Sequence, residues 1–274
     1  MKTRLIVLID FSAENLLKFA GLWSEILHAD LILIHQVPGL IPSLADGESR
    51  ALIIEEEKKE ALEKLKSLAF DYFPQLQNVK YHVSEQLLLT TIKSISVQDN
   101  EYKNVVLTGL KKRGFFEQLI FGSTTSRIID ELDYPVIAIP ANIEAFIPEK
   151  IILSLSYRFP LNQGAYHRLI SAFEDTIQIS EIISVVTPKD NYLESETYLK
   201  SLTSEIKKEV PTSYKLFKGD EPFNEIKQHV LTGQKNCLLV VQKGSRTLSD
   251  QFFRKFFINE LVHDGSIPLV VLPL

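Results

Sequence analysis

The sequence has little of what several protein classes need. It contains one cysteine, Cys237, in 274 residues, which excludes a disulfide framework and a cysteine-based zinc site. Its first apolar run stops at Asp10, too short for a signal-peptide core, and no run approaches the roughly 20 apolar residues that span a bilayer. We therefore expect a cytoplasmic protein with no membrane partner.

An excess of positive charge is also lacking. The chain carries 30 Lys and Arg against 35 Asp and Glu, a net charge of −5, whereas nucleic-acid binders normally present a basic face. No nucleic-acid partner is expected, although backbone amides can still hold a small anion locally. The 6 histidines have no HxxxH or HxH spacing, so no metal site is expected.

Motifs that carry catalysis are missing as well. The sequence has no GxxxxGK[ST] phosphate loop, no SGGxDS pyrophosphatase loop after its first apolar run and no GxSxG nucleophile elbow. The spacing of its titratable residues indicates no pair that could act as catalytic acid and base. We predict no catalytic residue and no enzyme.

What the sequence does contain is one pattern written twice, in which short apolar runs alternate with amphipathic segments. The first copy predicts strands at residues 4–9, 31–34, 79–83, 105–108 and 135–139, with helices from Ser12 and at 48–73, 87–97 and 116–132. The second copy predicts strands at 150–155, 182–186, 214–217, 238–241 and 268–272, with helices at 162–173, 192–208, 221–231 and 250–262. The copies close alike, on YPVIAIP and IPLVVLP.

This alternation predicts the fold class. Strands that alternate with helices form a parallel sheet covered on both faces, and right-handed crossovers make each copy doubly wound. We predict an α/β protein of two doubly wound domains in tandem, each with a five-stranded parallel sheet. The domains are expected to span residues 1–142 and 149–274.

Ligands in such sheets bind beyond the carboxyl ends of the strands, where the strand order reverses. The first predicted strand is followed by Asp10, Phe11 and Ser12. The Asp10 carboxylate can accept a hydrogen bond from a ribose hydroxyl or an adenine amine. Alternatively, Asp10 and Ser12 cap the following helix, and the two roles do not exclude each other.

The segment after the fourth strand, residues 108–126, is the second candidate. Gly109 allows a sharp exit from the strand. Backbone amides and hydroxyls of residues 122–124 can face phosphates, assisted by the basic residues 111–113. The alternative is a loop and a helix whose basic side chains lie in solvent.

Together, IDFS after the first strand, the glycines with Gly-Ser after the fourth, and the closing PVIAIP resemble the universal stress protein (UspA) family. The resemblance covers the whole chain as a tandem pair and implies the adenine nucleotide alpha-hydrolase-like fold. Nucleotide-binding members carry G-2x-G-9x-G-[S/T] after strand four, and this backbone wraps the triphosphate of ATP. An aspartate after strand one contacts the nucleoside, and the end of strand two lines the adenine pocket.

Carried over to the first domain, the resemblance implies ATP as its cofactor. Lys112 occupies the place of the second glycine, where its side chain crowds a turn that needs glycine or else neutralises phosphate. The implied binding residues are Asp10, Phe11, His35, Gln36, Val37, Gly109, Lys112, Gly122, Ser123 and Thr124.

The second domain departs further from the family pattern. Ser156 replaces the aspartate, Gln242 replaces the first glycine, and Lys255 and Phe256 replace the Gly-Ser pair. Only the Gly-Asp pair after the third strand, residues 219–220, survives. We predict no nucleotide in this domain.

Other conspicuous residues have structural interpretations. Trp23 lies on the apolar face of a helix and is predicted to be core, and Cys237 is predicted to pack as a small hydrophobe. His35, at a strand end, is predicted to be hydrogen-bonded rather than catalytic. Residues 252–257, FFRKFF, favour core or inter-domain packing over a membrane or nucleic-acid element.

The resemblance also predicts how the two domains associate. Their last strands, residues 135–139 and 268–272, are expected to pair antiparallel as a pseudo-dimer, which removes two exposed sheet edges. Whether the chain forms a further homodimer stays open. The function predicted is non-catalytic stress response and ligand sensing; the alternatives are a scaffold for an unidentified protein partner and a slow ATP hydrolase.

Overall fold

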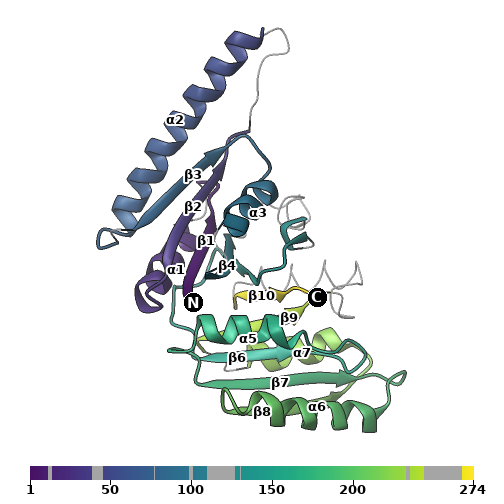
Figure 1. The fold of residues 1–274 in the computed structure, drawn as a ribbon. Coiled ribbons are helices and arrows are strands. Elements are labelled where there is room, and N and C mark those ends of the chain that lie inside the picture. Colours follow the sequence, from purple (N-terminus) through teal and green to yellow (C-terminus); the bar gives the residue numbers. More distant parts are fainter. Residues whose placement is uncertain are drawn as a thin grey trace.

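The computed structural model describes residues 1–11, 14–38, 46–76, 78–98, 101–109, 127–129, 131–232, 235–243 and 267–274. These residues form a 10-stranded sheet in the order β3-β2-β1-β4-β5-β10-β9-β6-β7-β8 (Figure 1). The first half supplies β1 (Lys2–Leu8), β2 (Asp30–Gln36), β3 (Val79–Ser84), β4 (Tyr102–Gly109) and β5 (Val136–Ile139). The second half supplies β6 (Lys150–Ser154), β7 (Ile179–Val186), β8 (Thr212–Lys218), β9 (Cys237–Gln242) and β10 (Leu269–Leu272).

The middle of the sheet joins the two halves. All strand pairs within each half are parallel, whereas β5 and β10 pair antiparallel, with Ile137 opposite Val270. The two halves are therefore related by a pseudo-two-fold at this seam. This pairing confirms the predicted pseudo-dimer, and it leaves β3 and β8 as the two edges of the sheet.

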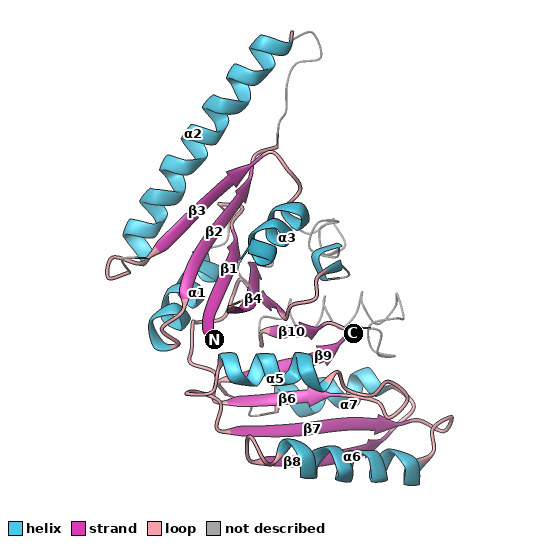
Figure 2. Ribbon diagram, viewed as in Figure 1, coloured by secondary structure: helices cyan, strands magenta, loops and turns pink. Residues whose placement is uncertain are grey.

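Helices lie on both faces of the sheet, as the alternating pattern predicts (Figure 2). The described helices are α1 (Glu14–Ile26), α2 (Gly47–Tyr72), α3 (Leu88–Gln98), α5 (Gln163–Ala172), α6 (Tyr192–Ile206) and α7 (Pro222–Leu231). Side chains of α1, α2, α5 and α6 share one apolar core, and those of α3 and α7 contribute to a second core on the opposite face.

Local chemistry fixes where several helices begin. The Asp46 carboxylate accepts the backbone N–H of Ser49 at 2.8 Å and caps α2. The Asn162 side chain accepts the N–H of Ala165 at 2.9 Å and caps α5 in the same way. Both caps fall within two residues of the predicted helix starts, 48 and 162. The predicted helix at 250–262 and most of that at 116–132 lie outside the described residues.

The described part of the chain contains no helix long and apolar enough to cross a membrane. The core itself agrees with the sequence predictions for two single residues. Trp23 is 1% exposed and Cys237 is 3% exposed, so both predictions of burial are confirmed. The segment 252–257 lies outside the described residues, and its predicted packing stays a prediction.

Candidate functional site

The strand order locates the candidate site in each half. Order reverses between β1 and β4 in the first half and between β6 and β9 in the second, so the crevices lie beyond the carboxyl ends of these strands. Leu8 pairs with Thr108 at the end of β1 and β4, which brings the residues after Leu8 and the strand end at Gly109 to one edge. The structure thus brings Asp10, Phe11 and Gly109 together at the carboxyl ends of β1 and β4.

Phe11 adopts an uncommon backbone conformation at this edge. Its φ of 63° lies in the left-handed region, which L-residues with large side chains rarely occupy. The ring is half-buried and packs on the His35 ring with centroids 4.2 Å apart, and Lys64 Nζ lies 4.3 Å from its centroid. Contacts from β2 and α2 thus hold a strained residue, and such residues cluster at functional sites.

His35 ties the end of β2 to the loop after β1. Its Nδ1 lies 2.8 Å from the carbonyl oxygen of Ile9. A carbonyl oxygen can only accept a hydrogen bond, so Nδ1 of His35 carries a proton and donates it to Ile9. The predicted hydrogen-bonded role of His35 is confirmed.

The two residues after His35 continue the same edge. Gln36 is half-buried, and Val37 is buried with its N–H donated to the carbonyl oxygen of Ser84 at 3.0 Å. This bond joins the carboxyl ends of β2 and β3. The structure therefore brings His35, Gln36 and Val37 next to the loop that carries Asp10 and Phe11.

Asp10 is exposed and lies two residues beyond the end of β1. Its two predicted roles, helix capping and ligand contact, stay predictions because Ser12 lies outside the described residues. The same holds for the phosphate-binding segment: Lys112, Gly122, Ser123 and Thr124 lie outside the described residues.

The second half differs from the first at one register position. Gly109 pairs with Ile139 at the end of β4, and Gln242 pairs with Leu272 at the equivalent end of β9. Gln242 is 3% exposed; its Nε2 donates to the carbonyl oxygen of Pro160 at 2.9 Å, and its Oε1 accepts the N–H of Asn162. The Gln242 side chain thus bridges β9 to the loop after β6, across the switch point where a ligand would enter.

Further side chains tie the second crevice together. Arg158 in the loop after β6 lies 3.0 Å from Asp190 in the loop after β7. The hydroxyl of Tyr198 on α6 accepts the N–H of Leu161 at 2.8 Å. These bonds, with that of Gln242, fix the loops at the carboxyl edge of the second half to one another.

A charged cluster that the sequence predictions missed lies elsewhere in the second half. Glu181 on β7 is buried, and its carboxylate contacts Lys150 at 2.6 Å, Lys215 at 2.8 Å and His229 at 3.1 Å. Burial alone raises the pKa of Glu181, but the hydrogen bonds from these three residues outweigh it and lower the pKa to about 2. The available signal was a carboxylate inside the apolar run ISEIISVV. Three tight partners indicate a structural role.

Among the described residues, no group of three or more His, Cys, Asp or Glu is arranged to hold a metal ion. The carboxyl edge of the first half instead presents the exposed carboxylate of Asp10, the half-buried ring of His35 and the glycine that ends β4. The carboxylate can accept hydrogen bonds from hydroxyl or amine donors of a ligand.

Comparison with solved structures identifies the fold. A universal stress protein from Archaeoglobus fulgidus matches with a TM-score of 0.67 at 11% identity, covering 100% of this chain and 99% of that chain. A functionally unknown protein from Pseudomonas aeruginosa PAO1 matches with a TM-score of 0.59 at 14% identity, covering 100% of this chain and 92% of that chain. The cytoplasmic domain of a prokaryotic cation chloride cotransporter matches with a TM-score of 0.56 at 10% identity, covering 99% and 95%.

The chain therefore has the tandem fold of universal stress proteins, as the sequence resemblance predicts. No family model matches the sequence, and no curated protein matches it. At these identities the likeness establishes architecture, and function has to be argued from the site.

Proposed function

We propose that the protein is a non-catalytic, universal-stress-type module that binds one adenine nucleotide in its first half. The observation that carries this proposal is the contrast between Gly109 and Gln242. At the same register position, the second half fills the switch point with a buried side chain, whereas the first half ends β4 on a residue that has none. A backbone without a Cβ is what close approach to phosphate requires.

The remaining first-half residues have complementary roles in the proposal. The exposed Asp10 carboxylate accepts hydrogen bonds from the nucleoside, and residues 35–37 line the base. Phe11 and His35 are already packed on each other, so the wall they form is preorganised and costs little ordering on binding. The phosphates would meet Gly109 and residues 122–124, with Lys112 supplying charge.

A second candidate is a scaffold that binds a protein partner and no nucleotide. The second half favours it, because there the same fold persists while Gln242 and Arg158 tie together the loops at the carboxyl ends of its strands. The cytoplasmic domain of a transporter also shares this fold. A slow ATP hydrolase is the third candidate, and turnover of ATP by the purified protein would be needed to support it.

Nucleotide released from purified, denatured protein distinguishes the first two functions. The proposal predicts adenine nucleotide in the released fraction and thermal stabilisation of emptied protein by Mg-ATP, because a ligand that binds only the folded state raises its stability. Asp10→Ala should abolish the shift. Ser156→Ala, at the equivalent position of the second half, is the matched control and should keep it. Neither released nucleotide nor a shift would favour the scaffold.

A further inference from the structure

Helix α2 is much longer than the equivalent helix of the second half. It has 26 residues, whereas α6, at the equivalent place in the second half, has 15. Its amino-terminal end extends beyond the tip of β3 (Figure 1). Only four of its side chains are buried, those of Ile54, Ala61, Leu65 and Ala69. Most side chains of α2 therefore stay at least partly accessible to solvent after the helix has packed on the sheet.

The face opposite Ala61 carries two large apolar side chains in solvent. Leu52 is 72% exposed and Phe70 is 77% exposed. They are 18 residues apart, about five helical turns and roughly 27 Å, so they share one face. Two such residues at opposite ends of one face differ from scattered exposed hydrophobics, which need no explanation.

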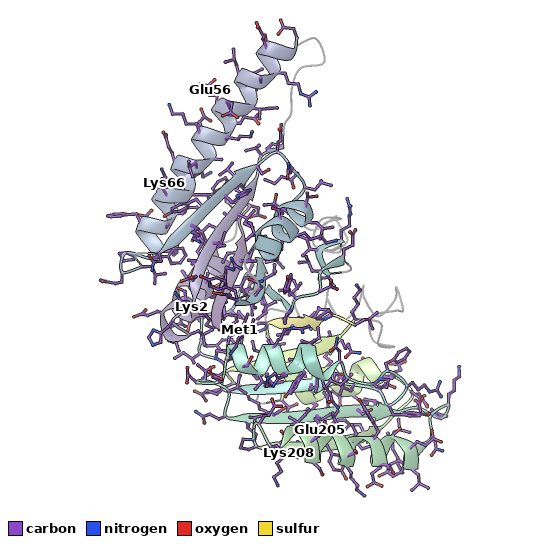
Figure 3. All side chains as sticks on the ribbon, viewed as in Figure 1. Met1, Lys2, Glu56, Lys66, Glu205 and Lys208 are labelled. Atoms are coloured by element: carbon purple, nitrogen blue, oxygen red, sulfur yellow. The ribbon has the colours of Figure 1, made fainter. Side chains whose placement is uncertain are left out.

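Four exposed charged residues fill the space between these two. From Leu52 onward the face presents Glu56, Lys59, Glu63 and Lys66, at helical spacings of three and four residues (Figure 3 labels Glu56 and Lys66). We call these four residues, with Leu52 and Phe70, the α2 stripe.

The α2 stripe is complementary to itself when it is reversed. A two-fold axis at the level of Ala61 sets Glu56 of one copy against Lys66 of the other. The same axis sets Lys59 against Glu63, and Leu52 against Phe70. A parallel pairing would instead set every charge against its own sign. A two-fold contact of this kind is isologous and closed, the commonest form of protein dimer.

We propose that a second copy of this chain docks antiparallel on the α2 stripe. Apolar contact of Leu52 with Phe70 at both ends supplies attraction, because it removes both side chains from water. The exposed ion pairs contribute little energy but fix the register and direction. One helix pair is a small interface, so the dimer is weak and depends on protein concentration.

Sedimentation velocity across about two decades of protein concentration tests association. The wild-type chain should shift from monomer to dimer. Leu52→Ser with Phe70→Ser should stay monomeric over that range, with an unchanged circular dichroism spectrum because both residues are exposed. The matched control is Leu193→Ser, which removes a 71% exposed leucine from α6 and should dimerise as the wild type does.

Charge reversal tests the register. Glu56→Lys alone and Lys66→Glu alone each set like charges against each other in a homodimer and should weaken it at least about tenfold. A mixture of the two single variants should form a heterodimer, and the double variant should recover the wild-type dimer. Glu56 and Lys66 lie about 15 Å apart along one helix, so this recovery cannot arise within a chain.

A wild-type chain that stays monomeric throughout the range would overturn the proposal. A dimer that is indifferent to both charge reversals would overturn it too, since its contact would lie elsewhere. The readout is association alone, so it does not depend on whether nucleotide binds.

Discussion

The ring of Trp23 meets the ring of Phe173 edge to face, with centroids 5.2 Å apart and ring planes at 89°. Trp23 belongs to α1 in the first half, and Phe173 caps the end of α5 in the second. Trp23 Nε1 also donates to the carbonyl oxygen of Phe146, in the connection between the halves, at 2.7 Å. The two halves therefore share one core and should unfold together.

Phe173→Ala should test that shared core. Phe173 is 0% exposed, so its loss leaves a cavity and should lower the free energy of unfolding by about 3–5 kcal/mol. Fluorescence of Trp23, the single tryptophan, and circular dichroism should give coincident urea transitions in the wild type. Leu193→Ala, at an exposed position, should change stability by less than about 0.5 kcal/mol. Two separate wild-type transitions would show that the halves unfold independently.

The bridge made by Gln242 should be measurable as stability. Gln242→Ala removes a buried side chain together with its two hydrogen bonds, to the carbonyl oxygen of Pro160 and from the N–H of Asn162, at a cost of about 1–3 kcal/mol. Urea denaturation gives the change. Gln228→Ala removes a glutamine side chain from the exposed side of α7, where no such bridge is lost. Its free energy of unfolding should stay near that of the wild type. Equal effects of both substitutions would refute the bridge.

The Glu181 cluster should make stability fall in acid. Its pKa is lowered to about 2 in the folded protein from 4.5, so the stabilisation is complete above about pH 4.5 and is lost as pH falls toward 2. Glu181→Gln should cost about 3 kcal/mol at neutral pH and flatten the curve in that window. Glu196→Gln breaks the i,i+4 pair with the exposed Lys200 at the surface of α6 and should cost under about 0.5 kcal/mol. An unchanged pH curve in Glu181→Gln would contradict this assignment.

Cys237 should be unreactive in the folded protein. Burial raises the pKa of its thiol to about 11, so little thiolate forms at pH 8, and the side chain is inaccessible. Reaction with a colorimetric disulfide reagent should be slow in buffer and rapid in denaturing urea. Rapid reaction in buffer would mean that β9 opens readily.

The fold follows from the sequence because the hydrophobic period and the turn residues repeat in both halves, but β2, β4, β7 and β8 are each at least three residues longer than predicted. β7 begins at Ile179 rather than 182, since its buried Ser180 and Glu181 find partners in Tyr166 and Lys150. β4 begins at Tyr102 rather than 105. Polar residues in a sequence indicate a loop unless it is known that distant residues form hydrogen bonds with them, which is what allows them to be buried in a strand.

The candidate site was predictable only in part, for a similar reason. Asp10 and Gly109 were identified because they follow strand ends, and topology then brings strand ends together. The side-chain bonds of Gln242 join residues about 80 positions apart, and the strain at Phe11 depends on packing by His35 and Lys64. Local patterns carry neither kind of information.

Calorimetric titration of nucleotide-free protein with Mg-ATP tests the central claim most directly, with Gly109→Gln as the decisive variant. This substitution gives the first half the side chain that occupies the second. We predict one nucleotide per wild-type chain and no binding by Gly109→Gln, with its circular dichroism unchanged. No binding by the wild type, two nucleotides per chain, or undiminished binding by Gly109→Gln would contradict the account.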